Sequence, residues 1–287
     1  MLLLVQFLRL QNMYLVRYFN LCLYFLILNG CLSLLTQTIN EMVLIPEGEF
    51  TMGYNIDNDN EWGDEDETPV HKVFLNSYYI DKYEVSALEF SNFLNHHQKQ
   101  STLYFESGSG VTIEKIGNKF RPRSGLDHFL ANRVSWYGAN SYCRWVKKRL
   151  PTEAEWEKAS RGVDARIFPW GDELPTNDRV TFRRKYKLLG FKVVEKVTSM
   201  PNGQSPYGIH HMAGNVWEWV SDWYDGFYYE KSPYANPKGP DSGTSKVLRG
   251  GNWYYKAYYM RTTYRFNDKP DVFKNWQGFR CAKDPNH

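Results

Sequence analysis

The sequence predicts a mixed α+β domain with short helices and strands and many loops. Its 287 residues are 17% aromatic, with 21 Tyr and 10 Trp, and 21 glycines and 13 prolines are spread along the chain. This pattern favours a loop-rich domain held together by Tyr and Trp side chains over a helical bundle or a parallel α/β sheet. A formal net charge of +3 gives no electrostatic basis for nucleic-acid binding.

Strand signals dominate the first part of the domain. Residues 42–53 read as two strands with a turn at 46–48, which predicts a hairpin, and residues 70–85 read as one further extended stretch. Between them lies a strongly acidic segment, 55–67, whose Asp57, Asp59 and Glu61 have a spacing similar to that of a calcium loop. Trp62 stands where such a loop needs glycine, so a solvated surface loop is the favoured interpretation.

Three helices are predicted from capping signals and apolar spacing. The helices are expected to begin near residues 87, 136 and 153. The capping residues are Ser86 with Glu89, Ser135, and Thr152 with Glu155. Residues 168–171 are then expected to form a buried turn.

The first 36 residues differ from the rest of the chain. Arg9 and Arg17 precede an apolar run at 21–28, which is typical of a signal peptide and too short to predict a membrane span. Gly30 stands directly before Cys31, as in the cleavage site of a bacterial lipoprotein. The sequence therefore predicts export to a bacterial cell envelope with a lipid anchor on Cys31. A plain secretory signal or an uncleaved anchor is the alternative.

Cysteine usage supports this interpretation. Cys22 and Cys31 belong to the leader, which leaves Cys143 and Cys281 for the remainder. Two distant cysteines in an oxidising compartment are most simply explained by a disulfide. The sequence shows no Cys/His cluster with the spacing of a zinc site.

Residues 208–219 are the most unusual stretch of the chain. They combine two glycines, two tryptophans and one carboxylate, Glu218, within twelve residues. Glycines allow the backbone to pass close to a neighbour, and each tryptophan needs a partner for its indole N–H. We expect an irregular, tightly packed loop in the middle of the domain, where backbone carbonyls and Glu218 could hold a hard cation.

Seven motifs occur in a fixed order and identify a family resemblance. They are Pro46-x-Gly48-x-Phe50-x-Met52-Gly53, Tyr83-Glu84-Val85-Ser86, Arg149-Leu150-Pro151-Thr152-Glu153-Ala154-Glu155-Trp156-Glu157, Pro169-Trp170-Gly171, Gly214-Asn215-Val216-Trp217-Glu218-Trp219, Leu248-Arg249-Gly250-Gly251 and Gly278-Phe279-Arg280. Together they resemble the formylglycine-generating-enzyme, or sulfatase-modifying factor, domain over about residues 42–284. The resemblance implies a loop-rich variant of the C-type-lectin fold, and it matches Cys143 and Cys281 to a disulfide pair of the family.

The resemblance implies copper chemistry that this sequence does not support. The oxidase of the family converts a sulfatase cysteine to formylglycine with copper(I) held by two cysteine thiolates. Those cysteines follow an Arg-Gly-Gly-Ser motif, which here ends in Asn252, and the cysteine positions hold Tyr255 and Met260. Trp217 matches the tryptophan of the oxygen pocket. Copper is therefore not expected, and Met260 is expected to be a core or pocket-wall residue.

The resemblance also implies one calcium site. Its residues here are His211, Gly214, Val216 and Glu218, of which Gly214 and Val216 would use backbone carbonyls. His211 stands where the family has Asn, and an imidazole is a poor ligand for a cation that prefers oxygen. A hydrogen-bonded Glu218 without a metal is the alternative.

Two functional hypotheses follow. The favoured one is a binding or scaffold module for a protein or small molecule, because the tyrosines after the Arg-Gly-Gly motif offer large contact area at low conformational cost. The alternative is a formylglycine-generating oxidoreductase that acts on a sulfatase cysteine through a non-standard site. The predicted ligand-binding residues are Trp217, Asn252, Tyr254, Tyr255, Tyr258 and Met260.

Overall fold

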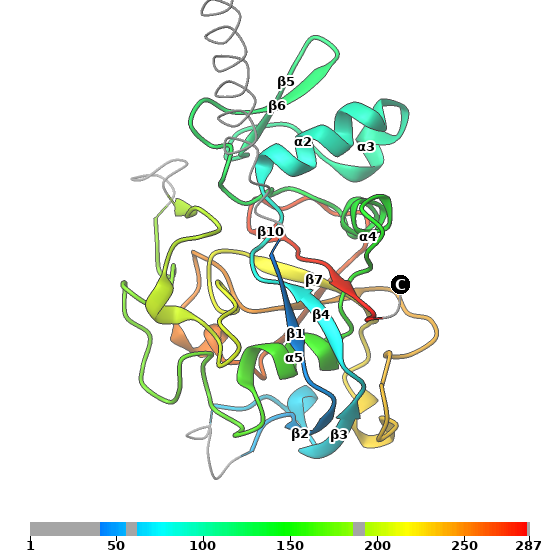
Figure 1. The fold of residues 1–287 in the computed structure, drawn as a ribbon, viewed down its shortest axis with the longest axis vertical. Helices are drawn as coiled ribbons and strands as arrows, with labels where there is room; N and C mark the ends of the chain where they lie inside the picture. The colour runs from blue at the N-terminus through cyan, green and yellow to red at the C-terminus, as the bar shows by residue number, and fades with distance from the viewer. Residues whose placement is uncertain (1–40, 56–61, 186–192, 286–287) are drawn as a thin grey trace, which may run out of the picture. The chain divides into compact units, whose positions relative to one another are not determined.

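The structure is a computed structural model that describes residues 41–55, 62–185 and 193–285. Short strands and helices joined by long loops make up this part of the chain (Figure 1). Cys31 and residues 56–61 of the acidic segment lie outside the described residues. The residues from Asn40 to His287 belong to one compact unit. Within the described ranges, no helix has the length and apolar character needed to cross a membrane.

The largest sheet lies in the middle of this unit and has the strand order β10-β7-β8-β9. The strands are β7 (Trp217–Trp223), β8 (Lys246–Arg249), β9 (Arg265–Asp268) and β10 (Gln277–Gly278). Strand β10 runs parallel to β7, and the other neighbours are antiparallel. Strand β7 buries both Trp217 and Trp219, so the glycine- and tryptophan-rich stretch 208–219 does lead into the core.

The predicted hairpin at 42–53 is wrong. Strand β1 (Met42–Ile45) pairs with β4 (Tyr78–Asp81), whose other edge pairs with β11 (Ala282–Lys283), while β2 (Gly48–Met52) pairs with β3 (His71–Leu75). The predicted strand over 70–85 is accordingly two strands in two sheets. The turn carbonyls of Pro46 and Gly48 accept hydrogen bonds from the buried Lys158 ammonium at 2.8 and 2.9 Å, so Lys158 fixes the turn between the two strands.

The capping predictions are confirmed. Ser86, Ser135 and Thr152 are the N-cap residues of three helices, and two of the three caps are full capping boxes. These three helices are α2 (Ala87–His96), α4 (Trp136–Trp145) and α5 (Glu153–Arg161). A further short helix, α3 (Ser101–Tyr104), follows α2. A hairpin of β5 (Ile113–Ile116) and β6 (Lys119–Pro122) lies beside α2 (Figure 1).

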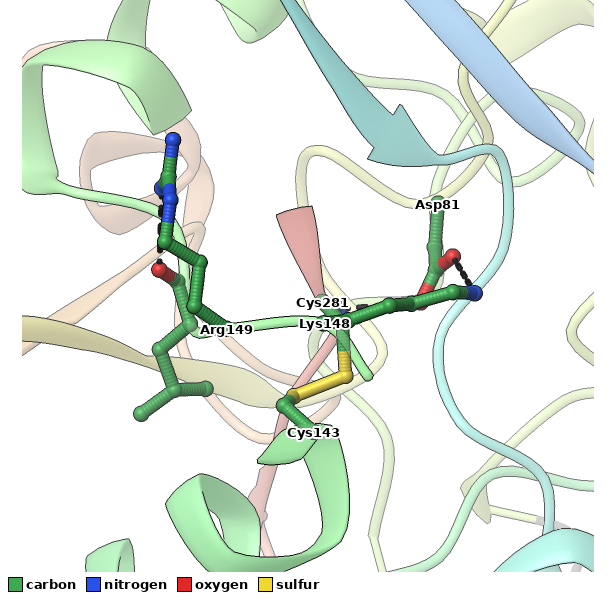
Figure 2. Close-up of a disulfide and its surroundings, with 6 residues drawn as sticks. Asp81, Cys143, Lys148, Arg149 and Cys281 are labelled. Carbon is green, nitrogen blue, oxygen red and sulfur yellow. Dashed lines mark hydrogen bonds and ion pairs between the residues drawn. A yellow bond between two sulfur atoms is a disulfide. The ribbon is translucent and has the colours of Figure 1, made fainter. Parts of the chain in front are cut away.

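One apolar cluster surrounds the disulfide that joins α4 to the residue directly before β11. Cys143 and Cys281 are bonded, with Cα atoms 5.6 Å apart, as predicted. Figure 2 shows Lys148 and Asp81 beside this bond, and their ion pair measures 2.6 Å. Asp81 also accepts a hydrogen bond from the Cys281 N–H at 3.0 Å. The disulfide closes a loop with a sequence separation of 138 residues. By lowering the entropy of the unfolded chain, it stabilises the fold by about 5 kcal/mol in the chain-entropy model.

A second kind of core consists of buried ion pairs around α5. Arg249 contacts Glu153 at 3.0 Å and Glu157 at 2.6 Å, and Arg265 contacts Glu153 at 2.8 Å. Burial by itself raises the pKa of Glu153, but Arg265 and Arg249 outweigh it and lower the pKa. We name this set the ion-paired core; it consists of Glu67, Glu153, Glu157, Arg249, Arg261 and Arg265.

Glu67 corrects the prediction of a solvated acidic loop. It lies in the single-turn helix η1 (Glu65–Glu67), and its carboxylate is fully buried. Both carboxylate oxygens accept hydrogen bonds from the Arg261 guanidinium at 2.7 Å. The segment ends inside the protein because this arginine compensates the buried charge.

Candidate functional site

Trp217, the residue matched to the oxygen pocket of the family, is covered by aromatic rings. Its ring centroid lies 5.0 Å from that of Phe266, 5.7 Å from Tyr264 and 6.1 Å from Tyr255. The side chain is fully buried, and among the described residues its indole N–H has no hydrogen-bond partner. Trp217 is therefore a core residue, and its indole is not exposed to a ligand in solution.

Five tyrosines continue outward from Trp217 as one packed group. We name them the tyrosine cluster: Tyr254, Tyr255, Tyr258, Tyr259 and Tyr264. Ring centroids lie 4.5 Å apart for Tyr255 and Tyr259, and 5.5 Å apart for Tyr258 and Tyr264. Tyr254 is 60% exposed, and the other four are half-buried. The cluster thus runs from the core to the surface.

Backbone turns and one polar contact hold the cluster in place. The buried Asn252 accepts hydrogen bonds from the N–H groups of Tyr254 and Tyr255 at 2.8 and 3.2 Å, which is the local turn that asparagine favours. The Tyr258 hydroxyl donates to Asp64 at 2.5 Å. Asn252 therefore positions the tyrosines, and ligand binding by its side chain stays a prediction.

The two former cysteine positions have different surroundings. Met260 is fully buried in an apolar cluster with Ile167, Phe168, Val180 and Ala213. A side chain on the neighbouring Gly251 would meet the Met260 methyl at 2.6 Å, so the chain is tightly packed here. Tyr255, by contrast, is half-buried among other rings. Met260 is a core residue, one of the two roles predicted for it.

These residues do not fit a copper(I) centre of the thiolate type. A phenol is a poor copper(I) ligand, and the thioether of Met260 is a weak one enclosed by carbon atoms. In the described ranges, both cysteines are consumed by the Cys143–Cys281 disulfide. The described residues therefore supply no thiolate for the metal.

At the predicted calcium site, the carboxylate already has protein partners. Glu218 accepts hydrogen bonds from the Arg280 guanidinium at 2.6 and 2.7 Å and from the Trp156 indole at 2.9 Å. A buried carboxylate paired in this way is compensated without a metal. The two predicted backbone ligands are Gly214 and Val216. Gly214 has φ +71° and lies against Val180 and Thr181, where only glycine fits. Val216 is buried.

His211 is the least suitable member of the calcium set. Its Nε2 lies 3.1 Å from the Lys196 carbonyl oxygen and 3.3 Å from the Ser199 hydroxyl, so this nitrogen carries the proton that donates to the carbonyl. Burial lowers the pKa of His211 to about 3, which keeps the ring neutral. Calcium binding by these four residues stays a prediction, and the donors present do not favour it.

One group of acidic side chains lies close enough together to hold a cation, within the ranges described. Asp64, Asp66 and Glu67 each offer an oxygen within 4.8 Å of the others. Each is already engaged, Asp64 by Tyr258, Asp66 by Tyr224 at 2.7 Å, and Glu67 by Arg261. These carboxylates support the tyrosine cluster, since Arg261 also lies 4.7 Å from the Tyr258 ring centroid.

The role of the ion-paired core beside the cluster was not predicted from the sequence. Arg249 begins the Arg-Gly-Gly motif, and Glu153 and Glu157 belong to the motif around Trp156. A signal was present, because charged residues repeat inside motifs that also contain buried tryptophan and glycine. The motif arginine and glutamates hold the segments on which the candidate site is built.

The order of the strands, the disulfide and the loop 208–219 define a domain of the formylglycine-generating-enzyme type. Comparison with known proteins agrees with this class. The chain belongs to the sulfatase-modifying factor enzyme 1-like domain family, whose model matches residues 32–285. Its copper positions differ from those of the family's oxidase, as described above.

Individual relatives differ in length and name. The chain is 33% identical to the formylglycine-generating enzyme of Mus musculus, over 86% of this chain and 76% of that protein. It is 36% identical to serine/threonine-protein kinase pkn1 of Chlamydia pneumoniae, but it spans only 38% of that relative's length. Among solved structures, PvdO from Pseudomonas aeruginosa matches with a TM-score of 0.68 and 26% identity, covering 85% of this chain and 94% of PvdO.

Proposed function

We propose that the protein is an exported, lipid-anchored binding module that has kept the fold of its family and lacks the copper oxidase chemistry. The observation that carries the proposal is the pair of residues at the cysteine positions. Met260 is enclosed in the core and Tyr255 is packed among tyrosine rings, so neither can replace a thiolate.

The tyrosine cluster is the proposed binding surface. Its rings hold one another at centroid distances of 4.5 to 5.6 Å, and Asn252 and Asp64 fix the ends of the segment. A surface that is already ordered loses little conformational entropy when a ligand binds. Tyr254, the most exposed member, would make first contact, and Tyr255 and Tyr258 would form the floor. The ligand would be a protein segment or small molecule with a flat or apolar face.

The lipid anchor is proposed from the leader sequence alone. Cys31 follows Gly30 and an apolar run, as in a lipoprotein cleavage site. Metabolic labelling with a clickable palmitate analogue tests it directly. We expect label on the wild-type protein and none on Cys31→Ser, with Cys22→Ser as the matched control; label on both variants would contradict the proposed attachment site.

The alternative is formylglycine generation through a non-standard site. The identity of 33% to a named formylglycine-generating enzyme favours this alternative. Both hypotheses share the fold, and they differ only in whether a sulfatase cysteine is oxidised.

A single assay separates the two. The purified protein is incubated with copper(I), oxygen and a sulfatase peptide that contains the target cysteine, and the peptide is analysed by mass spectrometry. We expect no formylglycine from the wild type. A second experiment tests whether two thiols at the family's positions retain copper(I). It compares copper(I) binding by the double variant Tyr255→Cys/Met260→Cys with binding by the control Tyr258→Cys/Met260→Cys. Formylglycine produced by the wild type would overturn the proposal.

A further inference from the structure

A cleft of about 620 Å³ lies outside the tyrosine cluster. Its walls come from the turn between β3 and β4, from α4, from the segment that leads into α5, and from residues 236–238. No residue of the tyrosine cluster and none of the predicted calcium ligands lines it. Neither the proposed binding function nor formylglycine generation uses this cleft.

Arg149 forms a fixed wall of the cleft. Its guanidinium donates to Glu155 at 2.7 Å through two nitrogens, to Asp284 at 3.2 and 3.3 Å, and to the Leu150 carbonyl at 3.2 Å. Figure 2 shows Arg149 on the segment that follows Lys148 beside the disulfide. Its donors are all engaged and its charge is balanced by the two carboxylates. Arg149 therefore shapes the cleft and is not available to a ligand.

Two other cations in the lining are not balanced. Arg144 lies near the end of α4 and Lys238 lies in the facing loop, and both side chains are exposed. Among the residues described, neither side chain makes an ion pair or a hydrogen bond. Two unpaired cations in the lining of one cleft favour an anion, and a dianion in particular.

Neutral polar groups with unused hydrogen-bonding capacity line the same cleft. The side chains of Asn140 and Ser77 line the cleft, and in the described chain neither has a hydrogen-bond partner. The opposite loop is fixed, because Asn236 accepts a hydrogen bond from the Asn76 N–H at 2.8 Å. Pockets for apolar ligands are lined mostly by hydrophobic and aromatic side chains, and this lining contains no aromatic residue.

We propose that this cleft is a binding site for a small, hydroxyl-rich dianion of the sugar-phosphate class. Arg144 and Lys238 bind the phosphate group, since guanidinium and ammonium groups are the usual partners of phosphate oxygens. Asn140 and Ser77 hydrogen-bond the hydroxyl groups of the sugar. The site is separate from the tyrosine cluster, so this inference does not depend on the proposed function.

Chemical-shift titration of the ¹⁵N-labelled protein tests the site with three probes. Glucose 6-phosphate carries both features, inorganic phosphate only the charge, and glucose only the hydroxyls. We expect saturable shifts at residues of the cleft, with glucose 6-phosphate binding at least about tenfold more tightly than either other probe. Affinity should fall as sodium chloride is raised, because the cations are exposed.

Matched variants decide whether the named residues are responsible. Arg144→Gln/Lys238→Gln should weaken glucose 6-phosphate binding by about tenfold or more. Lys119→Gln/Lys269→Gln removes the same charge from exposed positions outside the cleft and should change the affinity less than about twofold. Asn140→Ala should weaken binding of glucose 6-phosphate and leave that of inorganic phosphate unchanged.

Three results would overturn the proposal. The first is the absence of saturable shifts in the cleft with glucose 6-phosphate. The second is an equal loss of affinity in both double variants, which would mean general attraction to a positive surface. The third is equal affinity for inorganic phosphate and glucose 6-phosphate, which would mean that an adventitious ion alone occupies the cleft.

Discussion

The ion-paired core and the tyrosine cluster are neighbours that are stabilised in different ways. In the core, each charge is buried and has a specific partner, such as Glu157 with Arg249 at 2.6 Å. In the cluster, ring contacts at 4.5 to 5.6 Å hold side chains that reach the surface. Arg261 connects the two, because it pairs with Glu67 and lies beneath the ring of Tyr258.

This difference explains how the fold can persist when the chemistry of the site changes. A buried charge without its partner is costly, so members of the core cannot be replaced one at a time. Aromatic and apolar contacts are less specific, and residues of similar size can substitute for one another. Tyr255 and Met260 are held by contacts of this less specific kind. The support of the site and its chemistry are therefore separable.

Neutralising one carboxylate of the ion-paired core should have the largest effect. Glu153→Gln removes the charge that Arg249 and Arg265 share, and leaves both guanidinium groups buried with incomplete compensation. We expect the free energy of unfolding to fall by about 3–5 kcal/mol. Urea denaturation followed by tryptophan fluorescence measures this loss.

The matched control is an ion pair at the surface. Glu114 contacts Arg121 at 3.1 Å on the β5–β6 hairpin, where the arginine is largely exposed. Glu114→Gln should cost less than about 1 kcal/mol. Similar losses in the two variants would show that the buried network has no special role and would remove the contrast between the two regions.

His211 is a third case, because it is buried like the residues of the ion-paired core but carries no charge. Its pKa is lowered from its usual 6.5 to about 3, chiefly by burial. Between these values the unfolded chain binds more protons than the folded one, so stability rises with pH in this window. The contribution of His211 is complete above about pH 6.5 and is lost as the pH falls toward 3.

The variant His211→Asn removes this titration and keeps a residue that tolerates φ +55°. From pH 7 to pH 5, the wild type should lose about 2 kcal/mol more stability than the variant. Urea titrations at both pH values give the difference. His96→Asn, at an exposed site, should behave as the wild type. An unchanged pH dependence in His211→Asn would mean that the imidazole is protonated at little cost in the folded state.

Local features of the fold could be predicted from the sequence, and long-range pairings could not. Helix starts depend on a capping residue and its third neighbour, so Ser86 and Thr152 were sufficient to locate α2 and α5. Strand pairing depends on segments that are distant in sequence. The pairing of β1 with β4 joins residues as distant as Met42 and Asp81, and no local pattern shows it.

The burial of α5 was hidden for a related reason. All nine of its residues are buried, although five of them are charged. A pattern of polar residues predicts an exposed face, since burying charge is costly. The cost is offset by arginines that lie about a hundred residues away, and no local pattern shows them.

The positions of the candidate residues could be inferred only in part from the sequence, and ligand binding by them stays a prediction. The motif resemblance located the cluster and the absence of thiolates, and the structure places Asn252, Tyr254, Tyr255 and Tyr258 in one segment. It does not place Trp217 at the surface, because Tyr255, Tyr264 and Phe266 cover its ring. Which aromatic rings lie inside depends on packing in three dimensions, and sequence spacing does not determine it.

Removing one hydroxyl from the tyrosine cluster should have a moderate effect. Tyr258→Phe deletes the hydrogen bond to Asp64 and keeps the ring over Arg261. We expect a loss of about 1 kcal/mol in the free energy of unfolding. Tyr259→Phe is the control, because in the described chain the Tyr259 hydroxyl has no partner, and it should change stability by less than about 0.5 kcal/mol. Equal effects would mean that the bond to Asp64 does not support the cluster.

The exposed end of the cluster should contribute least to stability. Tyr254 is 60% exposed and contacts its neighbours only edge-on, with ring centroids 5.6 Å from Tyr255 and 5.9 Å from Trp253. Tyr254→Ala should therefore lower the free energy of unfolding by less than about 0.5 kcal/mol, as should Phe227→Ala at another exposed aromatic position. A loss several times larger for Tyr254 alone would make this ring a structural part of the fold. A small loss leaves its exposed face free to serve the proposed binding surface, because a ring that the fold does not need can contact a ligand without destabilising the protein.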